Sequence, residues 1–130
     1  MSNKIKREIN WISGPVSFSI MKYCLCLREK DMARAYKSLN VDKSERLKFV
    51  SDGAHGTTHF LKSGDKLAAI VCMNRDITGN DAISLLVHEA THVWQAIQED
   101  ISEERPGDEI EAYSIQCIFR SLLEEYEKQK

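Results

Sequence analysis

The run Leu67-Ala68-Ala69-Ile70-Val71-Cys72-Met73 and the motif His88-Glu89-Ala90-Thr91-His92 lie close together in the chain. The run is apolar at every position, which predicts the most buried strand of a sheet. The motif lies in a segment whose apolar residues recur every three or four positions, which predicts an amphipathic helix. This apolar stripe consists of Ile83, Leu86, Val87, Ala90, Trp94 and Ile97. Together the two segments predict a helix packed on a sheet.

Three segments upstream of the buried run are also expected to form strands. Val16 to Leu27 is apolar and starts with strict alternation, whereas Arg46 to Val50 and Thr57 to Leu61 are shorter candidates. The tetrad Lys62-Ser63-Gly64-Asp65 contains turn-forming residues. We therefore expect Thr57 to Leu61 and the buried run to pair as a hairpin.

Two more helices are expected. Residues 29 to 39 carry apolar side chains at helical spacing, and a later helix is expected from Asp108 to about Glu127. Asn80 or Asp81 is expected to cap the helix that carries the motif. The charged tail from Glu124 to Lys130 is expected to fray.

The composition predicts one folded domain spanning residues 1–130. With 42% hydrophobic and 29% charged residues the chain is typical of a globular protein and not of a disordered one. We expect an α+β fold, with a small sheet of about three to four mostly antiparallel strands packed against two or three helices. The net charge of -2 gives no field that would hold nucleic acid. The apolar part of Val16 to Leu27 is too short to span a membrane.

The cysteines indicate a reducing compartment. Cys24, Cys26, Cys72 and Cys117 show no C-x-x-C spacing and lie within or beside apolar runs, where reduced thiols behave as small hydrophobic side chains. A cytoplasmic location is therefore expected.

The motif itself predicts a metal site. His88 and His92 are four residues apart, so on a helix they lie on one face and about 6 Å apart along the axis. Two imidazoles in that arrangement can bind one tetrahedral zinc ion. Zinc lowers the pKa of bound water to about 7, and Glu89 is placed to accept the proton of that water. We therefore expect Zn²⁺ as cofactor, although this short pattern also occurs by chance in unrelated helices.

A catalytic zinc site requires a third protein ligand. Glu111 is the preferred candidate because it lies on the same helical stripe as Ile115 and Ile118, which must face the partner of that helix. Glu109 shares a face with polar residues instead. The alternative for Glu111 is a capping box, in which Asp108 is the N-cap and no metal is involved.

Other side chains are weaker candidates. His55 and His59 are expected at the surface, because they would lie about 13 Å apart in an extended chain and could not share a metal ion. Cys72 is expected to be a core residue of the buried strand. Tyr113 or His59 is a candidate donor to the oxyanion of a reacting peptide.

The motif makes the chain similar to the zincin metallopeptidases. The later segment Glu109-Ile110-Glu111-Ala112-Tyr113 resembles that of the gluzincin group, in which the third ligand is a glutamate on a following helix. The resemblance covers residues 67 to 122, and in size it is closest to minimal single-domain gluzincins and to small metallopeptidase-like proteins of bacteria and phages.

The resemblance implies a role for each matching residue. His88 and His92 would be zinc ligands, Glu89 the general base, and Glu111 the third ligand. Some related families place the ligand glutamate earlier, which keeps Glu109 as the alternate. The resemblance implies a fold of the minimal zincin type.

These expectations combine into a zinc metallopeptidase that hydrolyses peptide bonds of a peptide or protein substrate. Thr57 to Leu61 is a candidate strand for binding an extended substrate, and the acidic segment Glu99 to Glu104 would favour basic substrates if it lines the cleft. One alternative is a non-catalytic zinc-binding module with a structural or regulatory role. Another is an amide hydrolase similar to deformylases, in which Cys72 would stand in as third ligand.

Overall fold

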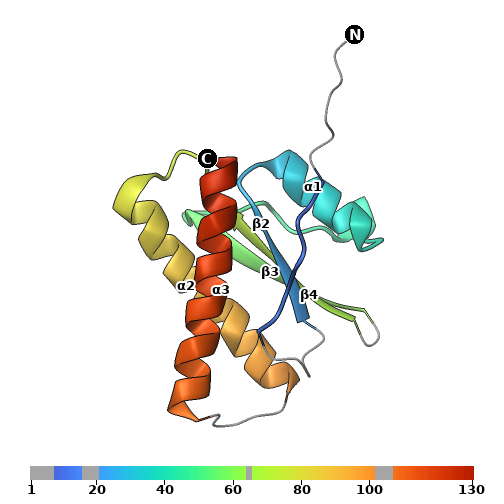
Figure 1. The fold of residues 1–130 in the computed structure, drawn as a ribbon. Coiled ribbons are helices and arrows are strands. Elements are labelled where there is room, and N and C mark those ends of the chain that lie inside the picture. The colour runs from blue at the N-terminus through green and yellow to red at the C-terminus, as the bar shows by residue number, and fades with distance from the viewer. Residues whose placement is uncertain (1–7, 16–20, 64–65, 102–106) are drawn as a thin grey trace.

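The computed structural model describes residues 8–15, 21–63, 66–101 and 107–130 (Figure 1). Within these ranges the chain forms a four-stranded mixed sheet and three α-helices, which confirms the predicted α+β class. The elements are β1 (Ile12–Ser13), β2 (Met21–Cys26), α1 (Glu29–Ser38), the 3₁₀ turn η1 (Lys43–Glu45), β3 (Gly56–Ser63), β4 (Lys66–Met73), α2 (Gly79–Asp100) and α3 (Asp108–Gln129). None of the described helices combines the length and apolar composition that crossing a membrane requires.

The sheet has the strand order β1-β2-β4-β3, which places β4 inside and β3 at an edge. The prediction for the run 67–73 is confirmed, because every side chain from Ala68 to Met73 is at most 3% exposed. The predicted hairpin is confirmed by the antiparallel register that pairs Ser63 with Lys66, while Gly64 and Asp65 lie outside the described residues.

The central pairing of β2 with β4 is parallel, in contrast to the outer pairings β1–β2 and β3–β4. The expectation of a mostly antiparallel sheet is therefore correct for the two outer pairings and wrong for the central one. A parallel pair needs a long crossover connection. Here α1 and β3 lie in that connection, so the sheet becomes mixed.

Side chains that alternate along β2 and β4 divide the core into two layers. One layer packs with α2 and α3, and its strand residues are Met21, Tyr23, Leu25, Ala69, Val71 and Met73. The other packs with α1, and its strand residues are Cys24, Cys26, Ile70 and Cys72. The sheet thus separates α1 from the two long helices (Figure 1).

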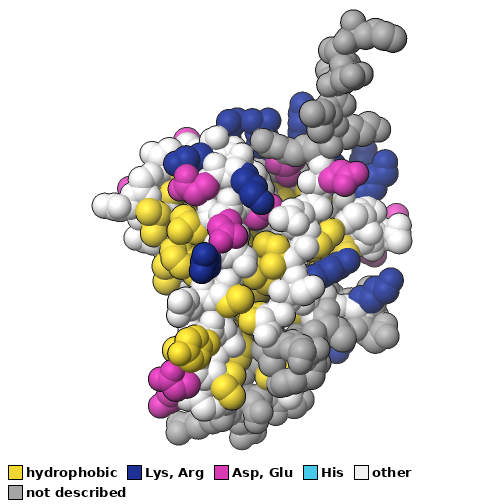
Figure 2. Space-filling view, in the orientation of Figure 1, with side chains coloured by type: hydrophobic (Ala, Val, Ile, Leu, Met, Phe, Trp, Pro, Cys, Tyr) yellow, Lys and Arg dark blue, Asp and Glu magenta, His cyan; other side chains and the backbone are white. Residues whose placement is uncertain are grey.

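Helix α2 is confirmed, but its buried face differs from the predicted stripe. Ile83 and Val87 are 41% and 44% exposed. The sheet and α3 instead cover Ala82, Leu86, Glu89, Ala90, Val93, Trp94 and Ile97. The predicted caps are also wrong, because Thr78 is the N-cap and forms no side-chain hydrogen bond there. Figure 2 shows hydrophobic side chains at the surface over α2 and α3.

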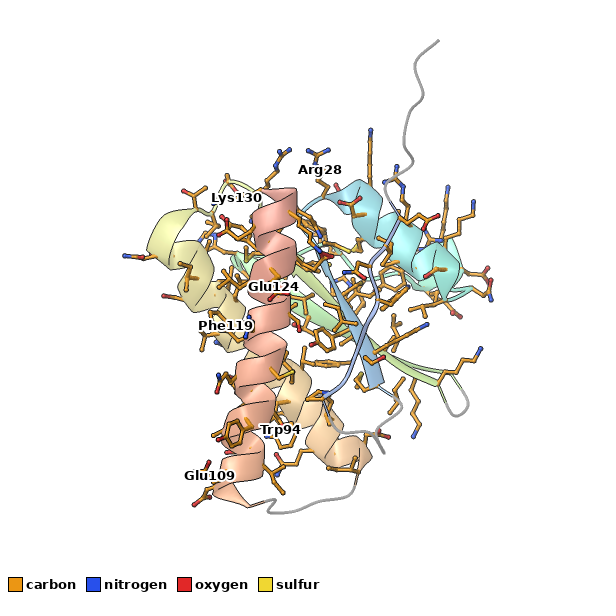
Figure 3. The ribbon with its side chains drawn as sticks, viewed as in Figure 1. Arg28, Trp94, Glu109, Phe119, Glu124 and Lys130 are labelled. Atoms are coloured by element: carbon orange, nitrogen blue, oxygen red, sulfur yellow. The ribbon has the colours of Figure 1, made fainter. Side chains whose placement is uncertain are left out.

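Helix α3 continues to Gln129, so the prediction of a fraying tail is wrong (Figure 3). Glu125 and Tyr126 are buried near its end. The Gln129 Nε2 donates a hydrogen bond of 2.9 Å to the carbonyl of Leu25 in β2. These contacts keep the last turns of α3 helical, although their charged composition by itself would favour fraying.

Of the two other predicted strands, Val16 to Leu27 is confirmed over Met21–Cys26 as β2, and residues 16–20 lie outside the described residues. Arg46 to Val50 is not a strand. The Leu47 N–H donates to the Tyr36 hydroxyl over 3.4 Å, and the Arg46 N–H donates to the carbonyl of Lys43, so neither is paired with a neighbouring strand.

His59 is 1% exposed, which contradicts its expected place at the surface. It points from β3 towards α1, where its Nδ1 lies 2.7 Å from the Tyr36 hydroxyl oxygen. Its Nε2 lies 3.2 Å from the carbonyl oxygen of Phe49. The Tyr36 hydroxyl donates to Nδ1, and Nε2–H donates to the carbonyl. A neutral imidazole therefore satisfies both of these partners.

Substitution of His59 by leucine is expected to flatten the dependence of stability on pH below neutrality. Burial lowers the pKa of His59 below its usual 6.5, so under acidic conditions the unfolded chain binds a proton that the folded chain does not. The free energy of unfolding should fall as the pH decreases from 6.5 towards the folded-state pKa, and His59→Leu should remove this contribution. Urea unfolding between about pH 7.5 and about pH 5.5 measures both slopes.

The same variant should lose about 1–3 kcal/mol at neutral pH, because the Tyr36 hydroxyl and the Phe49 carbonyl each lose a buried partner. His55→Gln removes an exposed histidine and should cost less than about 0.5 kcal/mol. An unchanged pH slope in His59→Leu would assign the acid sensitivity to other groups.

Candidate metal centre

His88 and His92 lie on the exposed side of α2, near its middle. Their Nε2 atoms are 3.1 Å apart, and the two rings meet edge to face with centroids 4.7 Å apart. Two nitrogen ligands of a tetrahedral zinc ion are separated by about 3.3 Å, because each Zn–N bond is about 2.0–2.1 Å long. The two Nε2 atoms are therefore spaced to occupy two coordination positions of a tetrahedral zinc ion.

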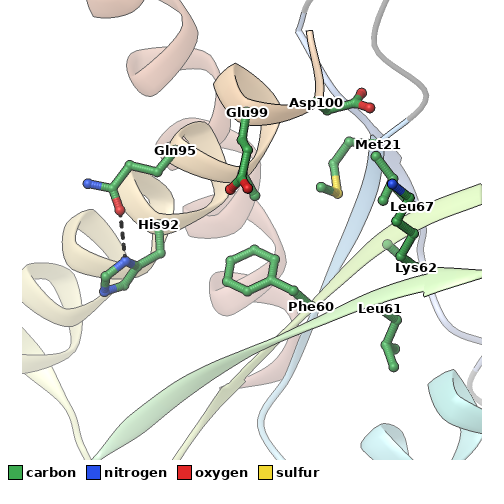
Figure 4. Close-up of a pocket in the computed structure, with 11 residues that line it drawn as sticks. Met21, Phe60, Leu61, Lys62, Leu67, His92, Gln95, Glu99 and Asp100 are labelled. Carbon is green, nitrogen blue, oxygen red and sulfur yellow. Dashed lines mark hydrogen bonds between the residues drawn. The ribbon is translucent and has the colours of Figure 1, made fainter. Parts of the chain in front are cut away.

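Gln95 fixes the orientation of one of these rings. Its Oε1 lies 3.1 Å from His92 Nδ1 (Figure 4), and an amide oxygen can only accept a hydrogen bond. His92 therefore carries its proton on Nδ1, which leaves the lone pair of Nε2 directed at His88. Metal-binding histidines commonly donate their second N–H in this way. Gln95 follows His92 by three residues and so lies on the same helical face, but nothing in the sequence indicates this contact.

Glu89 is only 2% exposed although it carries a carboxylate. The Thr58 hydroxyl in β3 donates a hydrogen bond to Glu89 Oε2. Sequence reasoning missed Thr58. The alternation within β3 was the available signal, because it places residues 58 and 60 on the face opposite to His59. The contact couples the edge strand directly to the motif.

Glu111 does not form the capping box that was its alternative explanation. Helix α3 has Gly107 as its N-cap, so Asp108 is already the first helical residue. The Glu111 carboxylate instead accepts a hydrogen bond of 3.2 Å from Trp94 Nε1–H, and Trp94 belongs to α2. The Glu111 side chain therefore lies against the motif helix through a tertiary contact.

In the described part of the chain, no third His, Cys, Asp or Glu side chain joins the histidine pair in an arrangement that would hold a metal ion. Glu109 is exposed, and Glu111 is held by Trp94 through its Oε2. The residues thus present two ligands at zinc spacing, whereas the Glu111 carboxylate is bound to the buried Trp94, on a different face of α2 from the two exposed histidines.

Cys72 lies on the opposite side of the sheet. It packs with the α1 layer, whereas the motif helix packs with the other layer. Burial raises the pKa of the Cys72 thiol far above its usual value and so opposes the thiolate form that a ligand requires. This placement removes the support for an amide hydrolase similar to deformylases.

Two cavities lie between α2 and the edge strand, one on each side of the histidine pair. A cavity of about 640 Å³ is lined by His88, Glu89 and the segment from Gly53 to Gly56, which includes the exposed His55. A cavity of about 620 Å³ is lined by His92 together with Phe60 of β3 (Figure 4). The candidate centre thus lies where an extended ligand along β3 would pass from one cavity to the other.

No protein-family model matches the chain, and no curated protein or solved structure matches it either.

Substitution of Thr58 by valine is expected to lower the free energy of unfolding by about 1–3 kcal/mol, because the buried Glu89 carboxylate loses its hydroxyl donor. Thr58→Ser keeps the donor and is the matched control. Both proteins should be compared by urea unfolding in the presence of a chelator, so that metal binding does not contribute.

The pair can be tested further by a double-mutant cycle with Glu89→Leu, which removes the acceptor. Thr58→Val and Glu89→Leu should be non-additive by at least about 0.5 kcal/mol, because either substitution alone removes the hydrogen bond. Strict additivity would show that the two side chains do not interact in solution.

Proposed function

We propose that this protein is a zinc-dependent metallopeptidase that hydrolyses peptide bonds. The observation that carries the proposal is the convergence of His88 Nε2 and His92 Nε2 to 3.1 Å on a helix that faces an edge strand. The buried Glu89 adds a carboxylate at the same place, since it shares the lining of one cavity with His88. These features agree with the resemblance to gluzincins and with a fold of the minimal zincin type.

The proposed zinc ligands are His88, His92 and Glu111. Trp94 Nε1–H holds one Glu111 carboxylate oxygen on the buried face of α2, whereas both histidines are exposed, so Glu111 would have to leave this partner to reach the metal. Gln95 orients His92 by accepting the hydrogen bond of its Nδ1–H. Glu109 stays the alternate ligand, although it is exposed and shares no such contact with α2.

In the proposed reaction Glu89 is the general base. Zinc, when bound, polarises the scissile carbonyl and makes water acidic enough to attack it near neutral pH. Glu89 accepts the proton of the attacking water and passes it to the leaving amine. Thr58 holds this carboxylate through its Oε2.

Of the two candidate oxyanion donors, Tyr113 is 67% exposed on α3. His59 is unsuited to the role, because both of its nitrogens are engaged on the far side of the sheet.

The proposed substrate is an extended peptide or protein segment. Strand β3 lies at the edge of the sheet, so its outer backbone groups are available for pairing with an added strand. The cavities on both sides of the histidine pair would accept side chains before and after the cleaved bond.

A specific observation favours a second candidate, a non-catalytic zinc-binding module with a structural or regulatory role. Glu89 is buried and hydrogen-bonded to Thr58, so it already has a role in packing that does not require catalysis. The two candidates share the same zinc ligands and differ only in what Glu89 does.

Purified protein is expected to hold roughly one zinc ion per chain, and His88→Ala and His92→Ala should each lose it. Elemental analysis after dialysis measures the stoichiometry. His55→Ala removes an exposed histidine of another segment and serves as the control that should keep the metal. Wild-type protein that holds no zinc and takes up none on addition would overturn the proposal.

Measurements of zinc binding to variants also identify the third ligand. Glu111→Gln should weaken zinc affinity by orders of magnitude, whereas Glu109→Gln should change it little. The reverse ranking of the two glutamates would move the ligand to Glu109.

Glu89→Gln is expected to keep the fold and the zinc but to lower peptidase activity by at least about a hundredfold. The fold should persist because a glutamine amide oxygen can still accept the Thr58 hydrogen bond. Hydrolysis of quenched fluorescent peptides measures the effect, with Glu124→Gln, an exposed residue of α3, as control. Full activity of Glu89→Gln together with loss of function in His88→Ala would establish the non-catalytic module.

A further inference from the structure

The cavity beside His92 has an apolar floor and an acidic end. Phe60 of β3 contributes to the floor, and its side chain is 46% exposed although it is aromatic. Met21 and Leu67 from the neighbouring strands complete the apolar lining. Glu99, from the last turn of α2, directs its carboxylate towards the Phe60 ring (Figure 4).

The described lining of this cavity carries more acidic than basic residues. Glu99 and Asp100 are acidic, and Lys62 is basic. A ligand side chain with a long hydrocarbon stem could cover Phe60 and place a cationic head near Glu99. Lysine and arginine have this composition, since their stems lie along apolar surface while the charge reaches water or a carboxylate.

The cavity adjoins the candidate centre, because His92 and Gln95 belong to its wall. Glu99 lies seven residues beyond His92 on the same helix, which corresponds to about 10 Å along the axis. An extended chain advances about 3.3 Å per residue. A substrate residue within one or two positions of the cleaved bond would therefore have its side chain over this cavity.

We infer that the cavity between β3 and the last turns of α2 is a specificity subsite for a lysine or arginine side chain of the substrate, close to the bond that is cleaved. The inference rests on the proposed peptidase function for its place in the reaction. The recognition itself depends only on Phe60 and Glu99, and so it can be measured without turnover.

The first test uses cleavage. A library of peptides prepared with a glutamate-specific protease, and therefore rich in internal lysine and arginine, is treated with the zinc-loaded protein, and the cleaved bonds are sequenced. Basic residues should be enriched at one position within two residues of the cleaved bond. Glu99→Gln should reduce that enrichment by about three- to tenfold, whereas Glu45→Gln in η1, an exposed glutamate outside the cavity lining, should leave it unchanged.

The second test uses binding to the zinc-loaded Glu89→Gln protein, which is expected not to cleave the peptides. Three host peptides carry lysine, its uncharged analogue norleucine, or glutamate at the enriched position, or at a central position if the first test yields no cleavage. Lysine should bind more tightly than norleucine by about three- to tenfold, and glutamate should bind most weakly. Adding Phe60→Ala should weaken lysine and norleucine alike by at least about tenfold, because both lose the apolar floor.

The outcomes separate the two proposals. Cleavage or binding without preference for lysine, or a preference that Glu99→Gln leaves unchanged, would overturn the subsite but not the peptidase. Preferential binding of the lysine peptide by a zinc-loaded wild-type protein that cleaves nothing would support the subsite and overturn the peptidase.

Discussion

The hydrogen bond from Thr58 to the buried carboxylate of Glu89 joins the edge strand to helix α2, and the arrangement of the site depends on it. A buried carboxylate is costly unless it is hydrogen-bonded, so the position of Glu89 is acceptable only where β3 supplies a donor. The strand comes close enough for this at Gly56, where an added Cβ would lie 3.1 Å from a methyl carbon of Leu85. Gly56 thus allows β3 to approach α2 closely, and Thr58, two positions later, supplies the hydroxyl that donates to Glu89.

Strand β3 serves both faces of the sheet through its alternating side chains. Thr58 and Phe60 face α2, where they contact the base and line a cavity. His59 faces α1 and bonds to the Tyr36 hydroxyl, and Leu61 packs in the same layer. A strand at the edge of a sheet is therefore fixed from both sides while its outer backbone edge stays available. This rigidity suits a strand that is proposed to align a substrate.

The contact between Trp94 and Glu111 has a comparable role on the other side of α2. It brings the first turn of α3 to the motif helix and replaces the local capping interaction that the sequence offered for Glu111. The second helix is anchored at its far end too, where Gln129 donates to the carbonyl of Leu25. With both ends held, α3 is fixed against the sheet and against the face of α2 that carries Trp94.

The sequence by itself determined the elements whose cause is local. The unbroken apolar character of residues 67–73 predicted a buried strand, and the turn residues at 62–65 predicted its hairpin with β3. The spacing of four between His88 and His92 placed their rings on one face, because helix geometry requires it. The tertiary structure alone decided that β2 pairs in parallel with β4, that Ile83 and Val87 are exposed, and that His59 is buried.

It also decided where each functional carboxylate is held. The partners Thr58 and Trp94 are 31 and 17 residues away from Glu89 and Glu111, so no periodicity within a segment could reveal them. The periodicity of apolar residues predicts whether a side chain is buried. Which residue it contacts there depends on which helices and strands pack together. That choice is made by the packing of the whole core.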